Sequence, residues 1–336
     1  MTERNKKSLS VLKLIGVATV LSSAAVGAST AAAQTASFPS KPVTIVTPFA
    51  AGSGPDAVLR LVAEKLYPIW NQRVLIDNKP GAAGFIAIDI AKRAAPDGYT
   101  LLQLDSEQVS ALPLLYKQKN FRTFDSFEPA ASMFRTPFLI ATSVNSKLGK
   151  VSDLVNAAKS EPNGMTYGSW GVGSPAHLGA SMLETATGTQ MRHVPYREVS
   201  QLFTAVATGD IAWSFATLPS SQGMYRGSKI KYLAVAAMKR IPQLPDIPTV
   251  AESGGPTGFE LNSFAVLLAP KGTSSAITAK INADLSKAMA DPEIRARFDS
   301  FAFEPLNWSS DEIRAQSKLK SIAYEKVIQQ GNISLD

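Results

Sequence analysis

The chain has 336 residues, a formal net charge of +7 and no cysteine. Without cysteine it forms no disulfide and no thiolate metal site, which suits an exported protein that has no disulfide framework. Its basic residues form no run interleaved with aromatic residues, so the charge argues against nucleic acid and at most helps a small anionic solute to arrive.

Residues 1–33 have the pattern of a cleaved secretory signal. Four basic residues lie in the first 13 positions, and an apolar, small-residue core runs from Leu14 to about Ala28. That core is too short to remain as a membrane anchor, and no cysteine follows it to carry a lipid. The Ala31-Ala32-Ala33 triplet fits the small-x-small cleavage rule, so we expect cleavage near Ala33 and a mature chain in the periplasm.

Beyond the signal, strand-like and helix-like segments alternate along the chain. The strand-like runs are short and apolar throughout, which is typical of parallel-sheet strands covered on both faces. They are Val43–Val46, Arg73–Ile76, Thr100–Leu104, Phe138–Thr142, Met165–Tyr167, Arg192–Val194, Ile211–Phe215, Lys231–Ala236 and Ala265–Ala269. The alternation predicts an α/β fold, and about 300 mature residues are more than one core usually holds, which predicts two domains.

Three of these strands lead into a glycine-bearing loop and then an amphipathic helix. The loops are Pro48–Asp56, Pro80–Gly84 and Gly168–Pro175. Each loop faces the free backbone N–H groups and the positive dipole end of the helix that follows it. Several such helix starts that converge on one cleft would bind an anion without arginine or metal.

The residues of the first two loops leave their roles open. Asp56 lies in the first turn of its helix, where a carboxylate commonly complements the dipole and bonds first-turn amides; alternatively it accepts a hydrogen bond from a ligand or an ordered water. In the second loop, Ala82, Ala83 and Gly84 either pack the helix tightly against its strand or offer N–H groups to a carboxylate.

The Gly168–Pro175 loop is glycine-rich but lacks the residues of a nucleotide site. No Gly-Lys-Ser/Thr follows it, as a P-loop requires, and Ala176 stands where a dinucleotide fingerprint has its third glycine. That fingerprint allows alanine, but no acidic residue closes the next strand at residues 194–196 to hold a ribose. We therefore expect no cofactor.

His177 and His193 are the only histidines of the chain. Two histidines without a clustered carboxylate motif do not indicate a metal site. His177 lies one turn into the helix after the third loop. There it either bonds local backbone or donates to a ligand or to the loop, and the residues alone leave both roles open.

Asp105, Ser106 and Glu107 follow the strand Thr100–Leu104. Ligands of open α/β sheets bind at the carboxyl ends of strands, so this position is a candidate ligand contact. Two carboxylates there would repel a purely anionic ligand. Either they point away, or the ligand also carries a donor such as an amine or a hydroxyl.

Several short motifs follow one another in a specific order. They are Phe38–Val43, Pro48 to Gly52 with Asp56, Asn78–Gly84, Ala95–Leu102, Tyr167–Leu178, His193–Tyr196, Leu244–Thr249 and Ala269–Thr273. Their order and spacing together resemble the solute receptors of tripartite tricarboxylate transporters, also called Bug proteins. The resemblance runs from about Phe38 to the C-terminus.

The resemblance implies a type II periplasmic-binding-protein fold, in which two α/β lobes enclose a ligand cleft and the chain crosses between them twice. Lobe one would hold residues 37–140 plus 265–336, and lobe two residues 141–264. Hinge closure would trap the ligand. It further implies delivery of the solute to membrane permease subunits. The sequence does not indicate the oligomeric state, and a monomer is the default expectation.

The resemblance also implies a small carboxylate ligand: a di- or tricarboxylate, an aromatic carboxylate, or an amino or hydroxy acid. Backbone amides and bridging waters at the first two loops would hold one carboxylate. With Ser106 from the strand-end argument, the expected ligand-binding residues are Phe49, Gly52, Ser53, Asp56, Ala82, Ala83, Gly84, Ser106, Ser169, Gly171, Val172, Gly173, Ser174, His177, Tyr196 and Thr217.

The chain departs from the family pattern at a few of these positions. Ser53 stands where a second glycine is usual, and Pro55 replaces a frequent threonine. Ala216-Thr217 stands where an Asp-Asn pair is common, and Arg197-Glu198-Val199 where lysine and glycines are usual. These departures leave the fold unaffected and put the identity of the far end of the ligand in question.

Three functions compete. The first is a receptor that closes on a carboxylate and presents it to a transporter. The second is a sensor subunit that hands its closed form to a signalling protein. The third is a hydrolase that uses Ser169 or Ser174 with His177; the sequence argues against it, because it has no nucleophile elbow, orienting acid or metal motif.

Overall fold

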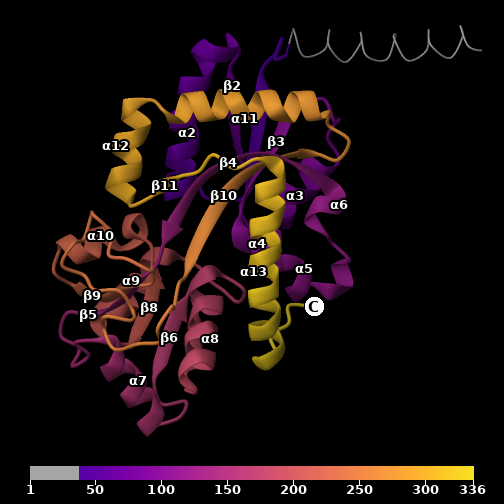
Figure 1. Ribbon diagram of the computed structural model, residues 1–336. Coiled ribbons are helices and arrows are strands. Elements are labelled where there is room, and N and C mark those ends of the chain that lie inside the picture. Colours follow the sequence, from indigo (N-terminus) through magenta and orange to yellow (C-terminus); the bar gives the residue numbers. More distant parts are fainter. Residues whose placement is uncertain (1–37) are drawn as a thin grey trace, which may run out of the picture.

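The computed structural model describes residues 38–336, so the expected signal segment 1–33 and its cleavage site lie outside the described residues. The described chain forms two mixed β-sheets, each covered by helices (Figure 1). We call the six-stranded sheet and its helices lobe one, and the five-stranded sheet and its helices lobe two. No helix in this part of the chain combines the length and the apolar character needed to cross a bilayer.

Lobe one is built on the strand order β11-β4-β10-β3-β1-β2. Its strands are β1 (Val43–Thr47), β2 (Val74–Asn78), β3 (Thr100–Asp105), β4 (Phe127–Pro137), β10 (Asn262–Pro270) and β11 (Glu304–Pro305). Its helices are α2 (Gly54–Trp70), α3 (Phe85–Lys92), α4 (Ser106–Ser110), α5 (Leu112–Leu115), α6 (Thr123–Ser126), α11 (Ser275–Met289), α12 (Pro292–Phe301) and α13 (Ser310–Gln330), with short 3₁₀ turns η1 (Ala82–Gly84) and η2 (Lys117–Lys119).

Lobe two is built on the strand order β7-β6-β8-β5-β9. Its strands are β5 (Leu139–Ser143), β6 (Thr166–Ser169), β7 (Arg192–Pro195), β8 (Trp213–Ala216) and β9 (Ile230–Val235). Its helices are α7 (Val151–Ser160), α8 (Pro175–Thr187), α9 (Val199–Thr208) and α10 (Leu218–Arg226).

Helices cover both faces of each sheet, which explains why the strands are apolar throughout. In lobe one, Val58 and Leu66 of α2 pack with Ile281 of α11 on one face, and Ile88 of α3 packs with Ile313 of α13 on the other. In lobe two, residues of α7 and α8 form one buried cluster and residues of α9 and α10 another. The burial of these side chains is the main favourable term for folding.

The sheets are mixed rather than parallel, which corrects part of the sequence-based expectation. Strands β1, β2 and β3 pair in parallel, as do β6, β7 and β8. Strands β5, β9 and β10, read as parallel-type strands, pair antiparallel with their neighbours. The 11-residue strand β4 was not predicted, because Pro129, Pro137 and the small residues between them conceal a strand that is nearly all buried.

Two crossing segments join the lobes. Strand β4 ends at Pro137 and β5 begins at Leu139, while β10 begins directly after Leu261. The crossings lie side by side, since the Phe138 N–H donates to the Leu261 carbonyl oxygen at 3.1 Å. The two crossings confirm the predicted topology; the residue limits of the lobes stay a prediction.

Helix α13 and the chain end form a third link between the lobes. In Figure 1 α13 (yellow) descends beside α4 and α5 and reaches α8. Tyr324 and Ile328 of α13 share a buried cluster with Leu178 of α8. After the helix, the Leu335 N–H donates to the Leu115 carbonyl oxygen at 2.9 Å, and the Asp336 side chain accepts from the backbone N–H groups at 117 and 118.

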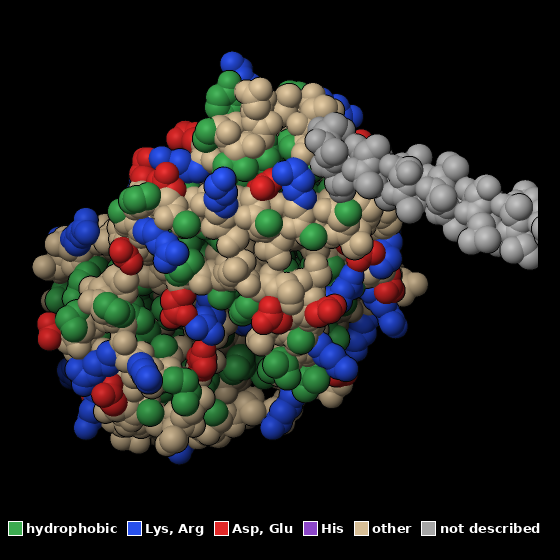
Figure 2. Space-filling model, turned by 45° about the horizontal axis from the view of Figure 1, so that its top comes forward, with side chains coloured by type: hydrophobic (Ala, Val, Ile, Leu, Met, Phe, Trp, Pro, Cys, Tyr) green, Lys and Arg blue, Asp and Glu red, His purple; other side chains and the backbone are tan. Residues whose placement is uncertain are grey.

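Charged side chains of both signs are interspersed on the face that Figure 2 shows, and no patch of one sign extends across it. Single apolar side chains lie between them, as on most soluble proteins. The informative polar groups are therefore the buried ones, and Glu107, Thr136 and Ser263 are buried polar residues that line the cavity described below.

Candidate functional site

A cavity of about 650 Å³ lies between the lobes. Lobe one lines it with the β1–α2 loop, the loop before α3, the start of α4 and parts of β4 and β10; lobe two lines it with the loops after β6, β7 and β8. Strand ends of both sheets thus meet at one cavity, as expected for ligand sites of α/β proteins. Its volume is within the range of small-molecule sites.

The β1–α2 loop presents an unsatisfied donor to this cavity. Ser53 is the N-cap residue of α2, yet its side chain makes no capping hydrogen bond. Its hydroxyl oxygen is buried and has no partner within residues 38–336, although Ser53 lines the cavity. A buried hydroxyl without a partner costs free energy, so a ligand atom that accepts from it would be stabilised.

Asp56 holds this loop instead of lining the cavity. Its buried carboxylate accepts from the Gly52 N–H at 2.7 Å, from Arg60 Nε at 2.9 Å and from Asn78 Nδ2 at 2.7 Å. Burial alone would raise the pKa of Asp56, but these three hydrogen bonds outweigh it and lower the pKa below its usual value. The Gly52 N–H is therefore already engaged, and Asp56 fixes the direction of the loop.

The second loop has an unusual backbone. Four successive residues, Gly81 to Gly84, have positive φ, including 47° at Ala82 and 54° at Ala83. Left-handed conformations cost alanine roughly 1–2 kcal/mol each, and such strain is concentrated at functional sites. No hydrogen bond within residues 38–336 engages the N–H groups of Ala82 or Ala83, so both remain free for an anion.

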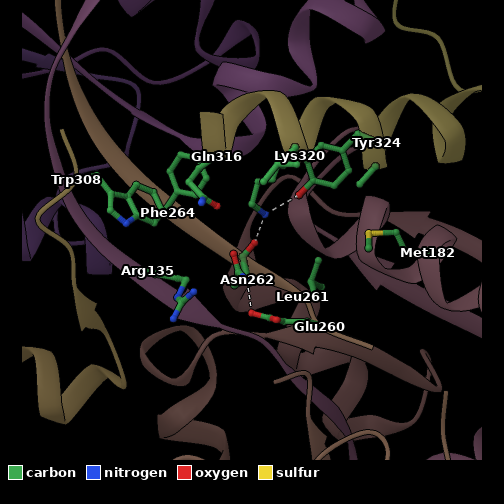
Figure 3. A pocket seen from close by; sticks show the side chains of 12 residues that line it. Arg135, Met182, Glu260, Leu261, Asn262, Phe264, Trp308, Gln316, Lys320 and Tyr324 are labelled. Atoms are coloured by element: carbon green, nitrogen blue, oxygen red, sulfur yellow. Dashed lines mark hydrogen bonds between the residues drawn. The ribbon is translucent and has the colours of Figure 1, made fainter. Parts of the chain in front are cut away.

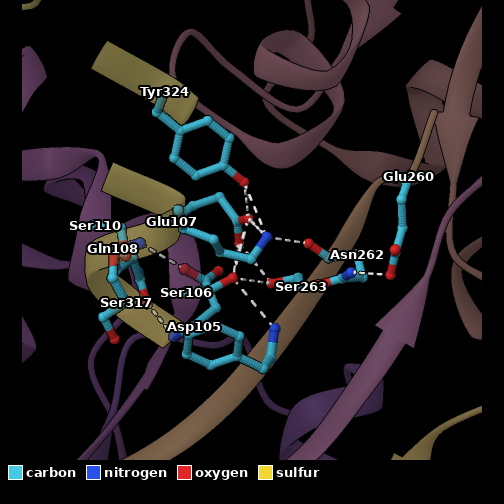
Figure 4. A network of polar contacts seen from close by, with 12 residues as sticks. Asp105, Ser106, Glu107, Gln108, Ser110, Glu260, Asn262, Ser263, Ser317 and Tyr324 are labelled. Carbon is cyan, nitrogen blue, oxygen red and sulfur yellow. Dashed lines mark hydrogen bonds and ion pairs between the residues drawn. The ribbon is translucent and has the colours of Figure 1, made fainter. Parts of the chain in front are cut away.

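The carboxylates after β3 have different surroundings (Figure 4). Glu107 is buried and accepts from the Ser106 hydroxyl at 3.0 Å, the Ser263 hydroxyl at 2.5 Å and the Tyr324 hydroxyl at 2.5 Å; Lys320 Nζ lies 3.4 Å away. Its charge is thus compensated from β10 and α13. Ser106 is fully buried and points to this network, not to the cavity.

Asp105 is the less compensated carboxylate. It caps α4, where its side chain accepts from the Gln108 N–H at 2.7 Å, and it lines the cavity. Burial, followed by the nearby charge of Glu107, raises the pKa of Asp105 to about 7. Near neutral pH, Asp105 therefore holds a proton for part of the time and can donate to a ligand oxygen.

The two histidines hold the third loop in place through hydrogen bonds on the side away from the cavity. Their rings stack with centroids 4.1 Å apart. His177 Nδ1 accepts from the Gly173 N–H at 3.1 Å, and His193 Nε2 lies 2.6 Å from the Ser169 hydroxyl oxygen. Of the two roles left open for His177, the geometry favours the bond to local backbone.

Burial keeps these histidines neutral. It lowers the pKa of His177 to about 3, with a contribution from His193, and it lowers the pKa of His193 to about 4. Neutrality matters because His177 Nδ1 must lack a proton to accept from Gly173. The histidines and Ser169 thus support the loop without lining the cavity, whereas Val172, Gly173 and Ser174 line it.

The predicted site residues divide into two groups. Those that line the cavity are Phe49, Gly52, Ser53, Ala83, Gly84, Val172, Gly173, Ser174 and Thr217. Those outside its lining are Asp56, Ala82, Ser106, Ser169, Gly171, His177 and Tyr196. Several of the second group support the first through hydrogen bonds, as Asp56 and His177 do.

Sequence reasoning missed part of the lining. Thr136 and Phe138 belong to the crossing that includes the unpredicted strand β4. Trp170 lies inside the predicted third loop but was not singled out. Arg197 also lines the cavity and lies two residues beyond the end of β7. Its position after a strand end was the sequence signal that could have predicted a ligand contact there.

A second cavity of about 310 Å³ lies behind the crossings, against α13 (Figure 3). Arg135, Asn262 and Lys320 are among its lining residues. Lys320 Nζ donates to the Asn262 carbonyl oxygen and lies 3.2 Å from the Tyr324 hydroxyl oxygen. Because Lys320 also faces Glu107, this network connects the back of the hinge with the cleft.

Two α/β lobes, two crossings and a cavity between strand ends define a periplasmic-binding-protein fold. The family described as "Tripartite tricarboxylate transporter family receptor" matches residues 58–333, and the chain belongs to this family.

Curated relatives cover most of the chain. A protein of the TAR-I ttuE-ttuC' intergenic region of Agrobacterium vitis is 33% identical over 80% of this chain and 78% of its own length. The protein BugT of Bordetella pertussis is 26% identical over 82% of this chain and 85% of its own length.

Solved structures agree in fold. The periplasmic binding protein BugD is 28% identical with a TM-score of 0.76, covering 88% of this chain and 99% of its own. The Rhodopseudomonas palustris proteins Rpa4515, solved with adipate, and MatC, solved with malate, have TM-scores of 0.79 and 0.76 at 28% and 26% identity. They cover 88% and 87% of this chain and 99% and 100% of their own.

Proposed function

We propose that this chain is an extracytoplasmic receptor that binds a small carboxylate between its lobes and presents it to the permease subunits of a tripartite tricarboxylate transporter. The observation that carries the proposal is the set of free donors on lobe one: the buried Ser53 hydroxyl and the unengaged N–H groups of Ala82 and Ala83. Together with the start of α2, they suit a carboxylate better than a neutral or cationic group.

The proposed first carboxylate site consists of Ser53, Ala82, Ala83 and Gly84. Backbone donors can hold a carboxylate directly or through bridging waters, so Ala82 contributes even though it lies outside the cavity lining. Asp56 and the two histidines act as positioning residues, since their side chains bond the loops. Relatives solved with adipate and with malate support an acid as the ligand class.

The surroundings of Ser169 support a receptor over a hydrolase. Ser169 is fully buried, and its hydroxyl pairs with His193 and not with His177. In the described part of the chain no carboxylate hydrogen-bonds His193, so no acid orients a serine–histidine pair. No cluster of three potential metal ligands occurs there either. A receptor needs none of these groups.

The same proposal places the mature chain in the periplasm as a monomer, after cleavage near Ala33. A sensor subunit that passes its closed form to a signalling protein is the second candidate, because such a protein would present the same cleft. A pull-down of the liganded chain with membrane partners separates the two: capture of permease subunits supports transport, and capture of a signalling protein alone contradicts it.

Calorimetry with matched acids and amides tests the ligand class. Adipate and malate are compared with their neutral diamides, and each solution is then analysed for conversion of the acid. We expect the acids to bind unchanged and to stabilise the protein, by about 2.7 kcal/mol at 100 times the dissociation constant. Equal binding of the diamides, or turnover of the acid, would contradict the proposal.

A further inference from the structure

Among residues 38–336, Arg197 is the one cationic side chain that lines the cleft cavity. It lies in the loop between β7 and α9, so it belongs to lobe two, whereas the free donors Ser53 and Ala83 belong to lobe one. Within residues 38–336, Arg197 forms no ion pair and no hydrogen bond. Arg197 is exposed, so its guanidinium is not held by the protein, and such a group is suited to bind an anionic ligand group in two-point geometry.

The two acidic residues that line the cavity, Asp105 and Glu107, do not pair with Arg197. Glu107 is bound by Ser263, Tyr324 and Lys320, so it has no need of Arg197. Asp105 lies at the start of α4 on lobe one. The two walls of the cavity therefore differ in charge. Lobe one contributes neutral donors and the neighbouring carboxyl groups of Asp105 and Glu107, whereas lobe two contributes the unpaired Arg197.

Between these walls the cavity is aromatic. Phe49 of lobe one and Trp170 of lobe two line it and are partly exposed. Phe134 and Phe138, which are buried, line it from the crossing that leads into lobe two, and Phe303 stacks on Phe134 at 4.2 Å. Phe49 and Trp170 are therefore the rings that can contact a ligand, one from each lobe, and a flat apolar group between them would gain more than its buried area alone provides.

From these observations we infer that the ligand is an aromatic dicarboxylate, with one carboxylate at the Ser53 and Ala83 loops and the second on Arg197. The inference rests on the proposed function and adds the far end and the body of the ligand. An acid with a single carboxylate would leave Arg197 unpaired in the closed cleft. Arg197 is then the residue that separates diacids from monoacids.

Three ligands that share a benzoate end and differ only in the para substituent test this arrangement by calorimetry. Benzene-1,4-dicarboxylate has two carboxylates, 4-methylbenzoate replaces one by a methyl group, and 4-(aminomethyl)benzoate replaces it by a cationic arm. We expect the diacid to bind about tenfold or more tightly than the methyl analogue, because a charge-assisted pair is lost in the latter. Tighter binding of the cationic analogue would overturn the inference and assign the far end to Asp105.

Variants of Arg197 locate the second carboxylate. Arg197→Gln should weaken the diacid by about tenfold or more and leave the methyl analogue unchanged, while Arg197→Lys should retain part of the preference because it keeps the charge without the two-point geometry. Glu198→Gln, which alters a neighbouring charge that does not line the cavity, serves as the control and should change neither ligand.

The outcomes separate this inference from the proposed function. If 4-methylbenzoate and the diacid bind equally, and Arg197→Gln changes neither, the inference fails and the receptor proposal stands. If none of the three aromatic acids binds while adipate does, the aromatic body is wrong. If no acid of either type binds, the proposed function itself has failed. Circular dichroism of each variant confirms that it is folded.

Discussion

Gly54 and Pro219 meet across the cleft: a methyl group added at Gly54 would lie 3.2 Å from Cγ of Pro219. Gly54 begins α2 in lobe one, and Pro219 lies in the first turn of α10 in lobe two. Both residues line the cavity, so lobe one and lobe two contact each other beside it. The size of residue 54 therefore limits how closely α2 and α10 approach each other at this point.

We predict that Gly54→Ala weakens ligand binding by about tenfold, since forced overpacking costs roughly 1–3 kcal/mol. Its unliganded stability should not fall, because Gly54 has an ordinary helical backbone and hinge opening in the absence of ligand would relieve the contact. The matched control is Gly223→Ala, a helical glycine of α10 whose added methyl group meets nothing within 4 Å. Calorimetry and urea unfolding measure both variants, and undiminished affinity in Gly54→Ala would show that the contact with Pro219 does not limit closure on the ligand.

The stacked histidines predict acid sensitivity. Their folded-state pKa values, about 3 for His177 and about 4 for His193, lie below the unfolded value near 6.5. The folded state therefore binds fewer protons, and stability is lost as pH falls from about 6.5 toward 4, by up to about 1.4 kcal/mol per pH unit for each histidine.

Urea unfolding between pH 7 and pH 4 measures this loss. His177→Asn keeps an acceptor for the Gly173 N–H but removes one titrating group, so its stability should fall less steeply with pH than that of the unaltered chain. Identical slopes for the two proteins would show that His177 does not titrate as its burial requires.

Asp105 predicts a pH dependence of binding. Its pKa of about 7 in the free protein rises further when an anion binds nearby, so binding takes up a proton. Affinity for an acid should then decrease as pH rises from about 7 to 8.5, by at most about tenfold per pH unit. Asp105→Asn keeps a capping side chain for α4 and should bind with little pH dependence. A dependence that persists in this variant would exclude Asp105 as its source.

The network behind the hinge predicts a specific pattern of stability changes. Lys320→Met removes the cation beside the buried Glu107 carboxylate and should lower the free energy of unfolding by about 3 kcal/mol. The double variant Lys320→Met/Glu107→Gln removes the charge as well and should recover most of that loss. Urea unfolding of both single variants and the double variant gives the coupling; additive effects would show that the pair does not interact.

The sequence predicts the frame of the site better than its details. Glycine and proline mark the three loops, and the strand before each loop is apolar. Both the positions of the loops and their convergence on one cavity could therefore be predicted from the sequence. The left-handed alanines at 82 and 83 were not, because alanine gives no signal for positive φ. The tertiary context imposes that conformation.

Contacts between residues far apart in the sequence could not be predicted either. No local pattern predicts that Glu107 meets Tyr324 and Lys320 on a helix more than 200 residues away. The stacking of His177 on His193 likewise depends on how α8 and β7 pack. Arg197 was recognised as unusual, but only the fold shows that it faces the same cavity as Ser53.

The anchoring of Leu335 to Leu115 has a practical consequence. A methyl group at Gly173, in a cleft loop of the other lobe, would lie 2.5 Å from Leu115 Cδ1 and 3.5 Å from Leu335 Cδ1. An affinity tag or fluorophore fused directly after Asp336 would therefore crowd the recognition loop, whereas a fusion placed ahead of Phe38 would avoid this corner of the molecule.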